Sequence, residues 1–509
     1  MLHLVDWLRS PRGQMTRRNW LSLGAFGAAC GLASRPRVGC SSPQTEISTG
    51  HGRAKSVVVV FTHGGQSQID MWDPKPQAPL DVRGDFSAIS TALPSVHFCE
   101  HMPRIARLAD RMTVVRSMSH EDLDHGSAVY LALTGFYHAR RSGNPPPSPT
   151  DLPTLGALVR RLQPRRDQIA TAVHLNAPAL VPTEPSPGQF GGVLGKALEP
   201  LVIGDPRSTT APRNSRDSLP TEAPSNAFAP PDAIRSLPLD RPSNGVIAGL
   251  APRLDLPASR LENRLALKQT LDQVSRQLDQ HVGAIDFNNQ YRQAYEMLAS
   301  PQARFAFDLG NEPTQVRERY GLDRSGQSLL LARRLVEAEI PYINVIWNTS
   351  NRGQDREPDN TDWYGWDTHN DIFDALRDRL LPRFDQSFSA FIEDLDERGL
   401  LDTTLVIGMG EFGRAPRVAV ERNFAGSSPG RKHWPTVYSI VMAGAGVQRG
   451  AVVGASDRMG AEPVTERFGP WDVAATIFHA LGIDYRSHYR DALDRPLALC
   501  DGRPILAAY

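Results

Sequence analysis

Histidines and carboxylates recur in this sequence where apolar runs begin or end, a pattern typical of a metal site. Glu411 follows the apolar run Leu405 to Met409, and His433 precedes a second run, Val437 to Ala443. Such runs indicate strands buried on both faces, and open parallel sheets bind ligands at the carboxyl ends of their strands. Glu411 and His433 are therefore the leading candidates for metal ligands.

The run Val57 to Phe61 predicts the first central strand, and a tight turn with two glycines follows it. His63 stands in that turn, where α/β domains commonly begin their ligand site. The alternative for His63 is a partly buried histidine that hydrogen-bonds to the backbone. Asp70 is the second candidate ligand here, and a turn or capping carboxylate explains it equally well.

The segment WDTHN, Trp366 to Asn370, follows another predicted buried strand, Ile340 to Trp347. It places Asp367 and His369 two residues apart, a spacing that lets both side chains point toward one ion from an extended loop. A helix cap with a surface histidine is the alternative for either residue alone. It explains the pair less well.

Two histidines and three carboxylates stand together in SHEDLDHGS, just before a helix predicted over Gly126 to Leu133. A helix amino terminus stabilises negative charge and is a common position for a nucleophile. Ser127 could be that nucleophile if His125 or a metal activated it. In the alternative, Asp124 caps the helix and Ser127 is an ordinary first-turn residue.

The donor types restrict the metal and its chemistry. Imidazole and carboxylate ligands without thiolate suit Zn, Mn or Fe, whereas an oxygen-rich subset suits Ca or Mg. An ion held by Asp367, His369, Glu411 and His433 would polarise a phosphoryl or sulfuryl oxygen and bring the pKa of a bound water toward ~7. Arg414 is placed to clamp an oxyanion, or else to pair with a local carboxylate.

Composition excludes several classes of protein. The chain has 509 residues, 40% of them hydrophobic, which suffices for one large α/β domain with insertions or for two domains. Its formal net charge is zero, so no general attraction to nucleic acid or anionic lipid is expected. The four cysteines have no zinc-finger or CxxC spacing, which argues against a disulfide scaffold or a thiolate metal cage.

The first 50 residues are expected to be a signal and linker rather than part of the fold. TRRNWL places paired arginines before Leu21 to Ala33, an apolar stretch too short to span a bilayer. This resembles a twin-arginine export signal, which implies a periplasmic or cell-envelope protein. Cys40 is a candidate lipidation site, although Arg37 stands where a lipobox has an apolar residue.

Residues 51–509 are expected to form the α/β domain, with two additions. Residues 182–252 are rich in Pro and Ser and are interpreted as an insertion over the domain. Residues 256–339 have apolar residues three and four apart, which predicts a helical segment. The insertion could shape substrate access or be an inert surface loop.

Several longer motifs occur in a fixed order: VVVVFTHGGQSQIDMWDPKP, ADRMTVVRSMSHEDLDHGSAVYLALTG, GWDTHN, LLPRFDQSFSAFIEDLDERGLLDTTLVIGMGEFGRAPRV, HWPTVYSIVMAGAGV and VVGASDRMGAEPV. Together with the paired arginines they resemble the DUF1501 family over nearly all of residues 15 to 505. That family is similar to the alkaline phosphatase and sulfatase superfamily. The resemblance implies a mostly parallel central sheet sandwiched by helices and a metal-assisted hydrolase site.

The resemblance extends to single site residues, with departures. His433 matches the late metal histidine of the superfamily, and His63 lies near the first metal aspartate. Glu411 and Phe412 stand where an Asp-His pair is usual. Counting back from the LTG motif, the usual Cys or Ser nucleophile position falls on His125.

The sequence therefore predicts an exported metal-dependent hydrolase acting on sulfate or phosphate esters of a small molecule or polysaccharide. The divalent ion would be Zn, Mn, Ca or Mg, and the nucleophile a metal-activated water or Ser127. The alternative is a catalytically inactive envelope protein that keeps the fold to bind polysaccharide or a protein partner. A redox protein fits the sequence less well, because the chain lacks a dinucleotide-binding fingerprint and the cysteine spacing of an iron–sulfur cluster.

Overall fold

The computed structural model describes residues 49–164, 170–204, 301–352, 364–491 and 493–509. All of them belong to one compact unit, Ser48–Tyr509. The expected signal, the lipidation candidate Cys40, and most of the expected insertion and helical segment lie outside these residues. In the described part of the chain, no helix is both long and apolar enough to cross a bilayer.

The core of the domain is an eight-stranded sheet. Five of its strand pairs are parallel, and β13 alone runs antiparallel to both of its neighbours. The prediction of an α/β fold with a mostly parallel sheet is confirmed. In spatial order the strands are β14 (Ala451–Val453), β4 (Thr113–Met118), β13 (Tyr438–Ala443), β10 (Thr404–Met409), β1 (Ser56–Phe61), β9 (Tyr342–Ile346), β5 (Ala172–Leu175) and β8 (Leu201–Ile203).

Strand β1 forms the middle of the sheet because its sequence is apolar on both faces. Its six residues are all buried, and it pairs in parallel with β10 on one side and β9 on the other. Successive side chains of a strand point to opposite faces. Accordingly, Val58 and Val60 belong to one hydrophobic core, and Val57 and Val59 belong to the other.

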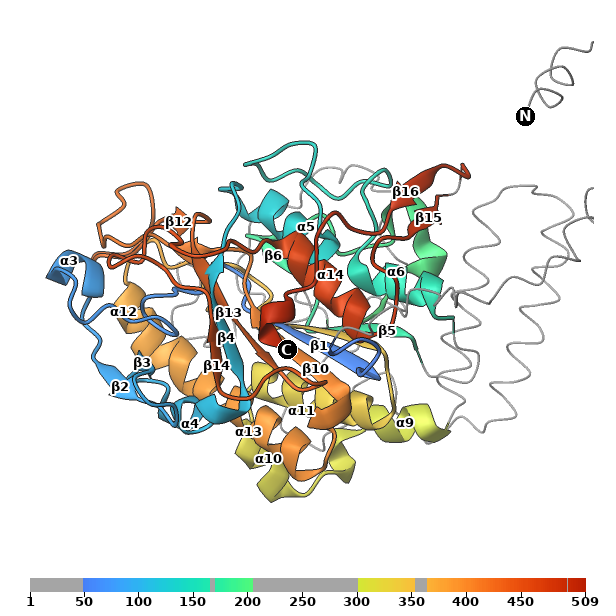
Figure 1. The fold of residues 1–509 in the computed structure, drawn as a ribbon, viewed down its shortest axis with the longest axis horizontal. Helices are drawn as coiled ribbons and strands as arrows, with labels where there is room; N and C mark the ends of the chain where they lie inside the picture. Colours follow the sequence, from blue (N-terminus) through green and yellow to red (C-terminus); the bar gives the residue numbers. More distant parts are fainter. Residues whose placement is uncertain (1–48, 165–169, 205–300, 353–363, 492) are drawn as a thin grey trace, which may run out of the picture. The chain divides into compact units, whose positions relative to one another are not determined.

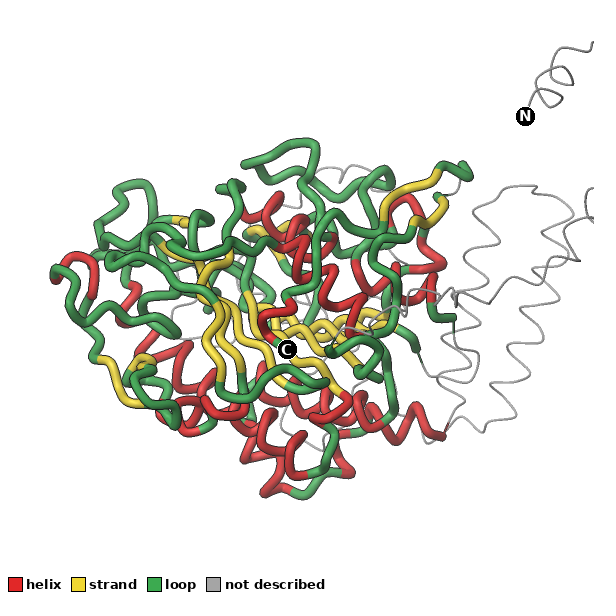
Figure 2. The backbone as a smooth tube through the Cα atoms, in the orientation of Figure 1, coloured by secondary structure: helices red, strands yellow, loops and turns green. Residues whose placement is uncertain are grey.

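Helices cover both faces of the sheet, as expected (Figures 1 and 2). The core on one face includes side chains from α4 (Pro103–Arg107), α9 (Pro301–Phe307), α10 (Thr314–Tyr320), α11 (Arg324–Glu337) and α13 (Leu381–Glu397). The core on the other face includes side chains from α5 (His125–Thr134), α6 (Leu155–Leu162) and α14 (Pro470–Ala480).

Smaller elements extend the connections between strands. A short helix α12 (Ile372–Asp374) continues through a π-helical stretch, Ala375–Leu380, into α13, and α3 (Leu80–Arg83) lies near the start of the domain. Four two-stranded sheets are also formed: β2 (Ala88–Ser90) with β3 (His97–Cys99), β6 (Leu180–Val181) with β7 (Glu184–Pro185), β11 (Gly413–Arg414) with β12 (His433–Trp434), and β15 (His488–Arg490) with β16 (Pro496–Ala498).

The topology brings five chain segments to one edge of the sheet. Strands β1, β9 and β10 are parallel, so the segments that follow them leave at the same edge. Strand β13 is antiparallel to β10, so the β12 segment before it reaches that edge from the opposite direction. Helix α5 follows β4 and contributes its first turn.

Candidate metal centre

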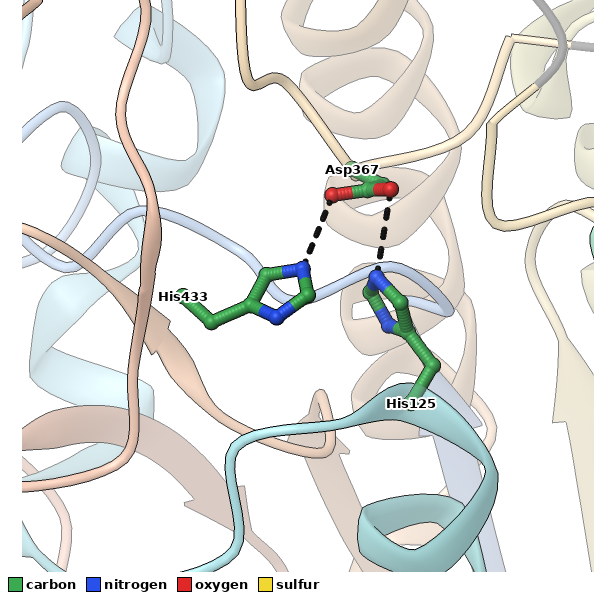
Figure 3. A group of neighbouring side chains, drawn as sticks. All are labelled: His125, Asp367 and His433. Atoms are coloured by element: carbon green, nitrogen blue, oxygen red, sulfur yellow. Dashed lines mark hydrogen bonds and ion pairs between the residues drawn. The ribbon is translucent and has the colours of Figure 1, made fainter. Parts of the chain in front are cut away.

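Asp367 is the common partner of three imidazole rings at this edge. Its Oδ1 atom lies 3.0 Å from His369 Nε2 and 3.2 Å from His433 Nε2. Its Oδ2 atom lies 3.2 Å from His125 Nε2, so the carboxylate stands between His125 and His433 (Figure 3). Asp367 is buried, and the loop after β9 supplies it.

Three of these atoms form a nearly equilateral triangle. The third edge joins His369 Nε2 to His433 Nε2 and measures 3.0 Å. Ligands bound to one tetrahedral ion at ~2.0 Å lie ~3.3 Å from one another. An overlapping set, His125, Asp367 and His433, offers ligand atoms that all lie within 4.8 Å of one another. The spacing of the donors therefore fits one small cation.

The backbone fixes the tautomer of His433. Its Nδ1 atom lies 2.6 Å from the Leu123 carbonyl oxygen, which can only accept, so Nδ1 carries the hydrogen. Burial lowers the pKa of His433 to about 4, which keeps the ring neutral at pH 7. Its Nε2 lone pair consequently points toward Asp367 and His369. A cation between these groups, or a proton on His369, relieves the repulsion between them.

His125 bridges the two carboxylates of the site. It is in the first turn of α5, and its Nδ1 atom lies 2.6 Å from Glu411 Oε1. Burial alone would lower the pKa of His125, but Asp367 and Glu411 raise it to about 9. A protonated His125 balances the carboxylates, so a metal ion would have to compete with that proton.

Glu411 is completely buried at the end of β10. Its carboxylate accepts the Gly64 N–H, at 2.9 Å from Oε1 and 3.2 Å from Oε2. Burial would raise the pKa of Glu411, but the hydrogen bond from His125 and the proximity of His63 hold it below its ordinary value. His120 fixes the backbone here, because its Nε2 lies 2.7 Å from the Glu411 carbonyl oxygen.

His63 lies deep in the same site. Its Nδ1 is 3.2 Å from the Thr349 carbonyl oxygen, so the hydrogen is on Nδ1 and the lone pair is on Nε2, inside the protein. Burial lowers the pKa of His63 to about 4. Among the described residues, buried His63 Nε2 has no hydrogen-bond partner. Such an orphaned lone pair beside His125 fits a site that takes a cation.

Arg414 is also buried at the site, but the protein itself occupies its guanidinium group. It donates to Asp367 Oδ1 at 2.8 Å, to the carbonyl oxygens of Gly65 and Arg431 at 3.0 and 3.2 Å, and to that of Gly64. This geometry supports the alternative of a pair with a local carboxylate over an oxyanion clamp.

The family with the description "Protein of unknown function (DUF1501)" matches residues 54–508. The chain belongs to the DUF1501 family. This confirms the family resemblance seen in its motifs. No curated protein matches this DUF1501 sequence.

Solved structures that resemble the DUF1501 chain are distant from it. A phosphonate monoester hydrolase from Silicibacter pomeroyi has 12% identity and a TM-score of 0.37, over 89% of this chain and 76% of that one. A sulfatase from Pseudoalteromonas sp. has 12% identity and a TM-score of 0.33, over 85% and 68%. An alkaline phosphatase from the Antarctic bacterium TAB5 has 11% identity and a TM-score of 0.31, over 79% and 95%.

Two predicted site residues of the DUF1501 protein lie in a separate network. Ser127 Oγ donates to Asp122 Oδ1 at 2.6 Å and accepts the Gly143 N–H at 3.2 Å. Asp124 precedes α5 at the N-cap position, with no capping hydrogen bond from its side chain. The observed contacts therefore tie Ser127 to the loop around Gly143.

Asp70 is the third predicted residue outside the cluster. Arg431 donates to both of its oxygens, at 2.7 and 3.1 Å, and Ser67 Oγ donates at 2.5 Å. Asp70 and Arg431 are both buried, so this is an internal ion pair. The other predicted residues lie together: hydrogen bonds and ion pairs join His125, Asp367, His369, Glu411, Arg414 and His433, and the His63 ring lies beside that of His125.

Two residues of the DUF1501 site were not assigned a role from the sequence. His120 accepts the Asp122 N–H on Nδ1 and donates from Nε2 to Glu411, which ties the segment before α5 to the end of β10. Phe424 stacks on His369. The histidine-rich SHEDLDH motif was a signal for His120, whereas nothing around Phe424 distinguished it from a surface-loop residue.

Proposed function

We propose that this protein is a metal-dependent hydrolase of sulfate or phosphate esters. The observation that carries the proposal is the triangle of donors formed by Asp367 Oδ1, His369 Nε2 and His433 Nε2. His125 contacts the triangle through Asp367, and His63 and Glu411 lie against His125 and add further buried nitrogen and oxygen donors. Such a mixed set without thiolate suits Zn or Mn, and Ca or Mg remain candidates for an oxygen-rich subset.

The charge of the site favours an anionic substrate. A divalent ion supplies Lewis acidity toward a phosphoryl or sulfuryl oxygen and lowers the pKa of a bound water. With His125 deprotonated, the ion and Arg414 outweigh Asp367 and Glu411 by one positive charge. An ester of a small molecule or polysaccharide that carries a sulfate or phosphate group would meet that charge.

The contacts of Ser127 favour water as the nucleophile. The Ser127 hydroxyl already donates to Asp122 and accepts from Gly143, and it is completely buried. His125 lies between the two carboxylates, where it can hold a proton close to the donor triangle. Its position in the first turn of α5 places it where the superfamily resemblance puts the nucleophile.

Metal content and turnover test this proposal directly. Purified protein is analysed for bound metals and assayed with nitrophenyl sulfate and nitrophenyl phosphate. Asp367→Asn and His433→Ala are expected to lower metal affinity at least ~10-fold and to abolish turnover. His488→Ala is the matched control because His488 is exposed and lies on β15. Metal-free wild-type protein without turnover, even after metal addition, contradicts the proposal.

One observation favours the alternative, an inactive envelope protein that binds polysaccharide or a partner. A protonated His125 together with Arg414 neutralises Asp367 and Glu411 without any ion. The buried network is then stable as a purely structural element. Unchanged thermal stability on addition of each candidate metal, with retention of an anionic polysaccharide on the protein, would favour this function.

Export is proposed from the paired arginines alone, which precede the described residues. Residues 1–50 fused to a reporter should direct it to the periplasm, and Arg17→Lys with Arg18→Lys should stop that export. Cys40→Ser tests the lipid anchor, since it removes the thiol to which the lipid would be attached. Unchanged fractionation of the Cys40→Ser protein contradicts the anchor.

A further inference from the structure

We propose that Phe424 is a positioning residue for His369, and that Asn370 and Asp371 hold it in place. This inference rests on the proposed function, because it takes His369 as a metal ligand. The rings of Phe424 and His369 are stacked, with centroids 3.7 Å apart and planes within 5° of parallel. Contact over a whole ring face restricts the tilt of the imidazole and thereby the direction of its Nε2 lone pair.

The three imidazoles around Asp367 differ in what orients them. His433 has the Leu123 carbonyl oxygen on its second nitrogen, and His125 has Glu411. Metal-binding histidines are usually oriented by such a hydrogen bond. His369 Nδ1 is buried and, among the described residues, has no hydrogen-bond partner. The stacked ring of Phe424 is the contact that takes over this role.

The loop of residues 417–430 that carries Phe424 is fixed by Asn370. The Asn370 side-chain amide donates to the carbonyl oxygens of Glu421, Phe424 and Ala425, at 2.9, 3.0 and 3.2 Å. Its oxygen accepts the Glu421 N–H at 2.8 Å. One buried asparagine thus holds the backbone on both sides of the stacked ring.

Asp371 holds the next part of the loop. Its Oδ1 atom accepts the N–H groups of Ser427 and Ser428, at 3.0 and 2.7 Å, and the Ser428 hydroxyl at 2.7 Å. Asp371 has a φ of 53°, in the left-handed region that residues other than glycine rarely adopt. This conformation is compensated by three hydrogen bonds, which indicates that the position of the loop is specified.

The same short segment therefore serves both the site and the loop. Asp367 and His369 supply two of the three atoms of the donor triangle, whereas Asn370 and Asp371 bind the loop of residues 417–430. Arg352, which follows β9, adds a further contact: its guanidinium carbon lies 4.6 Å from the Phe424 ring centroid. Displacement of the loop would consequently change the orientation of His369.

Binding of Co²⁺ tests the role of Phe424, with the visible absorption bands of the bound ion as a readout of ligand geometry. Phe424→Leu removes the ring face and is expected to weaken Co²⁺ binding by ~10-fold and to change the spectrum. Phe424→Tyr keeps the ring and should have the Co²⁺ affinity and the spectrum of the wild-type protein. Phe305→Leu, at an exposed phenylalanine on α9, is the matched control and should leave both unchanged.

Limited proteolysis tests, without any metal, whether Asn370 holds the loop of residues 417–430. Trypsin can cleave after Arg422, which is exposed in the loop. Asn370→Ala is expected to accelerate cleavage there several-fold and to weaken Co²⁺ binding in parallel. Asn311→Ala, at an exposed asparagine, should have neither effect.

The outcomes separate this inference from the proposed function. Wild-type protein that binds no Co²⁺ contradicts the proposed function, and with it any role of Phe424 in holding a ligand. Tight Co²⁺ binding by wild type and unchanged affinity and spectrum in Phe424→Leu contradict only the role of Phe424. If Asn370→Ala leaves the rate of cleavage after Arg422 unchanged, Asn370 does not hold the loop of residues 417–430.

Discussion

Arg414 donates to Asp367 Oδ1 at 2.8 Å, and neither side chain is more than 4% exposed. Arg414 comes from β11 and Asp367 from the loop after β9, so the contact joins two segments at the edge of the sheet. Burial would raise the pKa of Asp367, but His125 and Arg414 hold it well below its usual range. Asp367 is therefore ionised at neutral pH.

Removal of the Arg414 charge should destabilise the protein strongly. Arg414→Gln leaves Asp367 buried without its closest cation, and breaking such a pair typically costs ~3–5 kcal/mol. Urea unfolding measures the loss. Arg417→Gln is the control, because Arg417 is mostly exposed and lies 3.6 Å from Asp81. A loss below ~1 kcal/mol, the range of surface pairs, would show that the buried pair contributes little.

Gly64 should not tolerate a side chain. A Cβ atom there would lie 2.4 Å from the Asp367 backbone nitrogen and 2.8 Å from the Asn351 carbonyl oxygen. Gly64→Ala is therefore expected to displace the Asp367 loop and to reduce metal content, as measured by elemental analysis. Gly399→Ala separates this clash from backbone strain. Gly399 also has a positive φ but has open space around it, so only ~1–2 kcal/mol should be lost.

Ser127→Ala should retain turnover. Its hydroxyl binds Asp122 and Gly143, so its removal leaves the Gly143 N–H without its acceptor and takes one hydrogen bond from Asp122, which is expected to cost ~1–3 kcal/mol of stability. Urea unfolding and the ester assays are measured on the same preparation. Complete loss of turnover with metal content and stability unchanged would make Ser127 the nucleophile after all.

His174 should contribute to the loss of stability in acid. It is buried on β5, and burial lowers its pKa to about 3 from an ordinary 6.5. Between pH 6.5 and 3 the unfolded chain binds a proton that the folded protein does not. The free energy of unfolding therefore falls as the pH decreases through that range.

His174→Gln removes this titration. Unfolding in urea from pH 7 to pH 4.5 should give a shallower pH dependence in the variant, by up to ~1.4 kcal/mol per pH unit for one proton. His63 and His120 titrate in the same direction and remain in the variant, so some dependence should persist. An identical slope in wild type and variant would contradict the prediction.

The sheet was predictable because its central strands coincide with apolar runs in the sequence. Val57 to Phe61 and Leu405 to Met409 each lie within observed strands. His63 and Glu411 follow these two strands, and His433 precedes β13. A parallel sheet brings such positions to one edge whatever their separation in sequence. Local pattern and topology together thus located the candidate site.

The partners of individual carboxylates were not predictable. Asp70 and Asp367 both follow buried strands, yet Asp70 pairs with Arg431, 361 residues away, and Asp367 is surrounded by imidazoles. Which side chains surround a carboxylate depends on tertiary packing that no local spacing encodes. Phe424 is a similar case, because its stacking on His369 depends on a loop held by Asn370.

The position of β1 between β9 and β10 has a consequence for the order of folding. Strand β1 is near the start of the described chain, but its partners begin at Tyr342 and Thr404. Contacts between segments so far apart in sequence form slowly and late. During synthesis, β1 has no partner on its β10 side until the ribosome has passed Met409. A nascent chain can therefore acquire the candidate metal centre only when nearly all of it has been made.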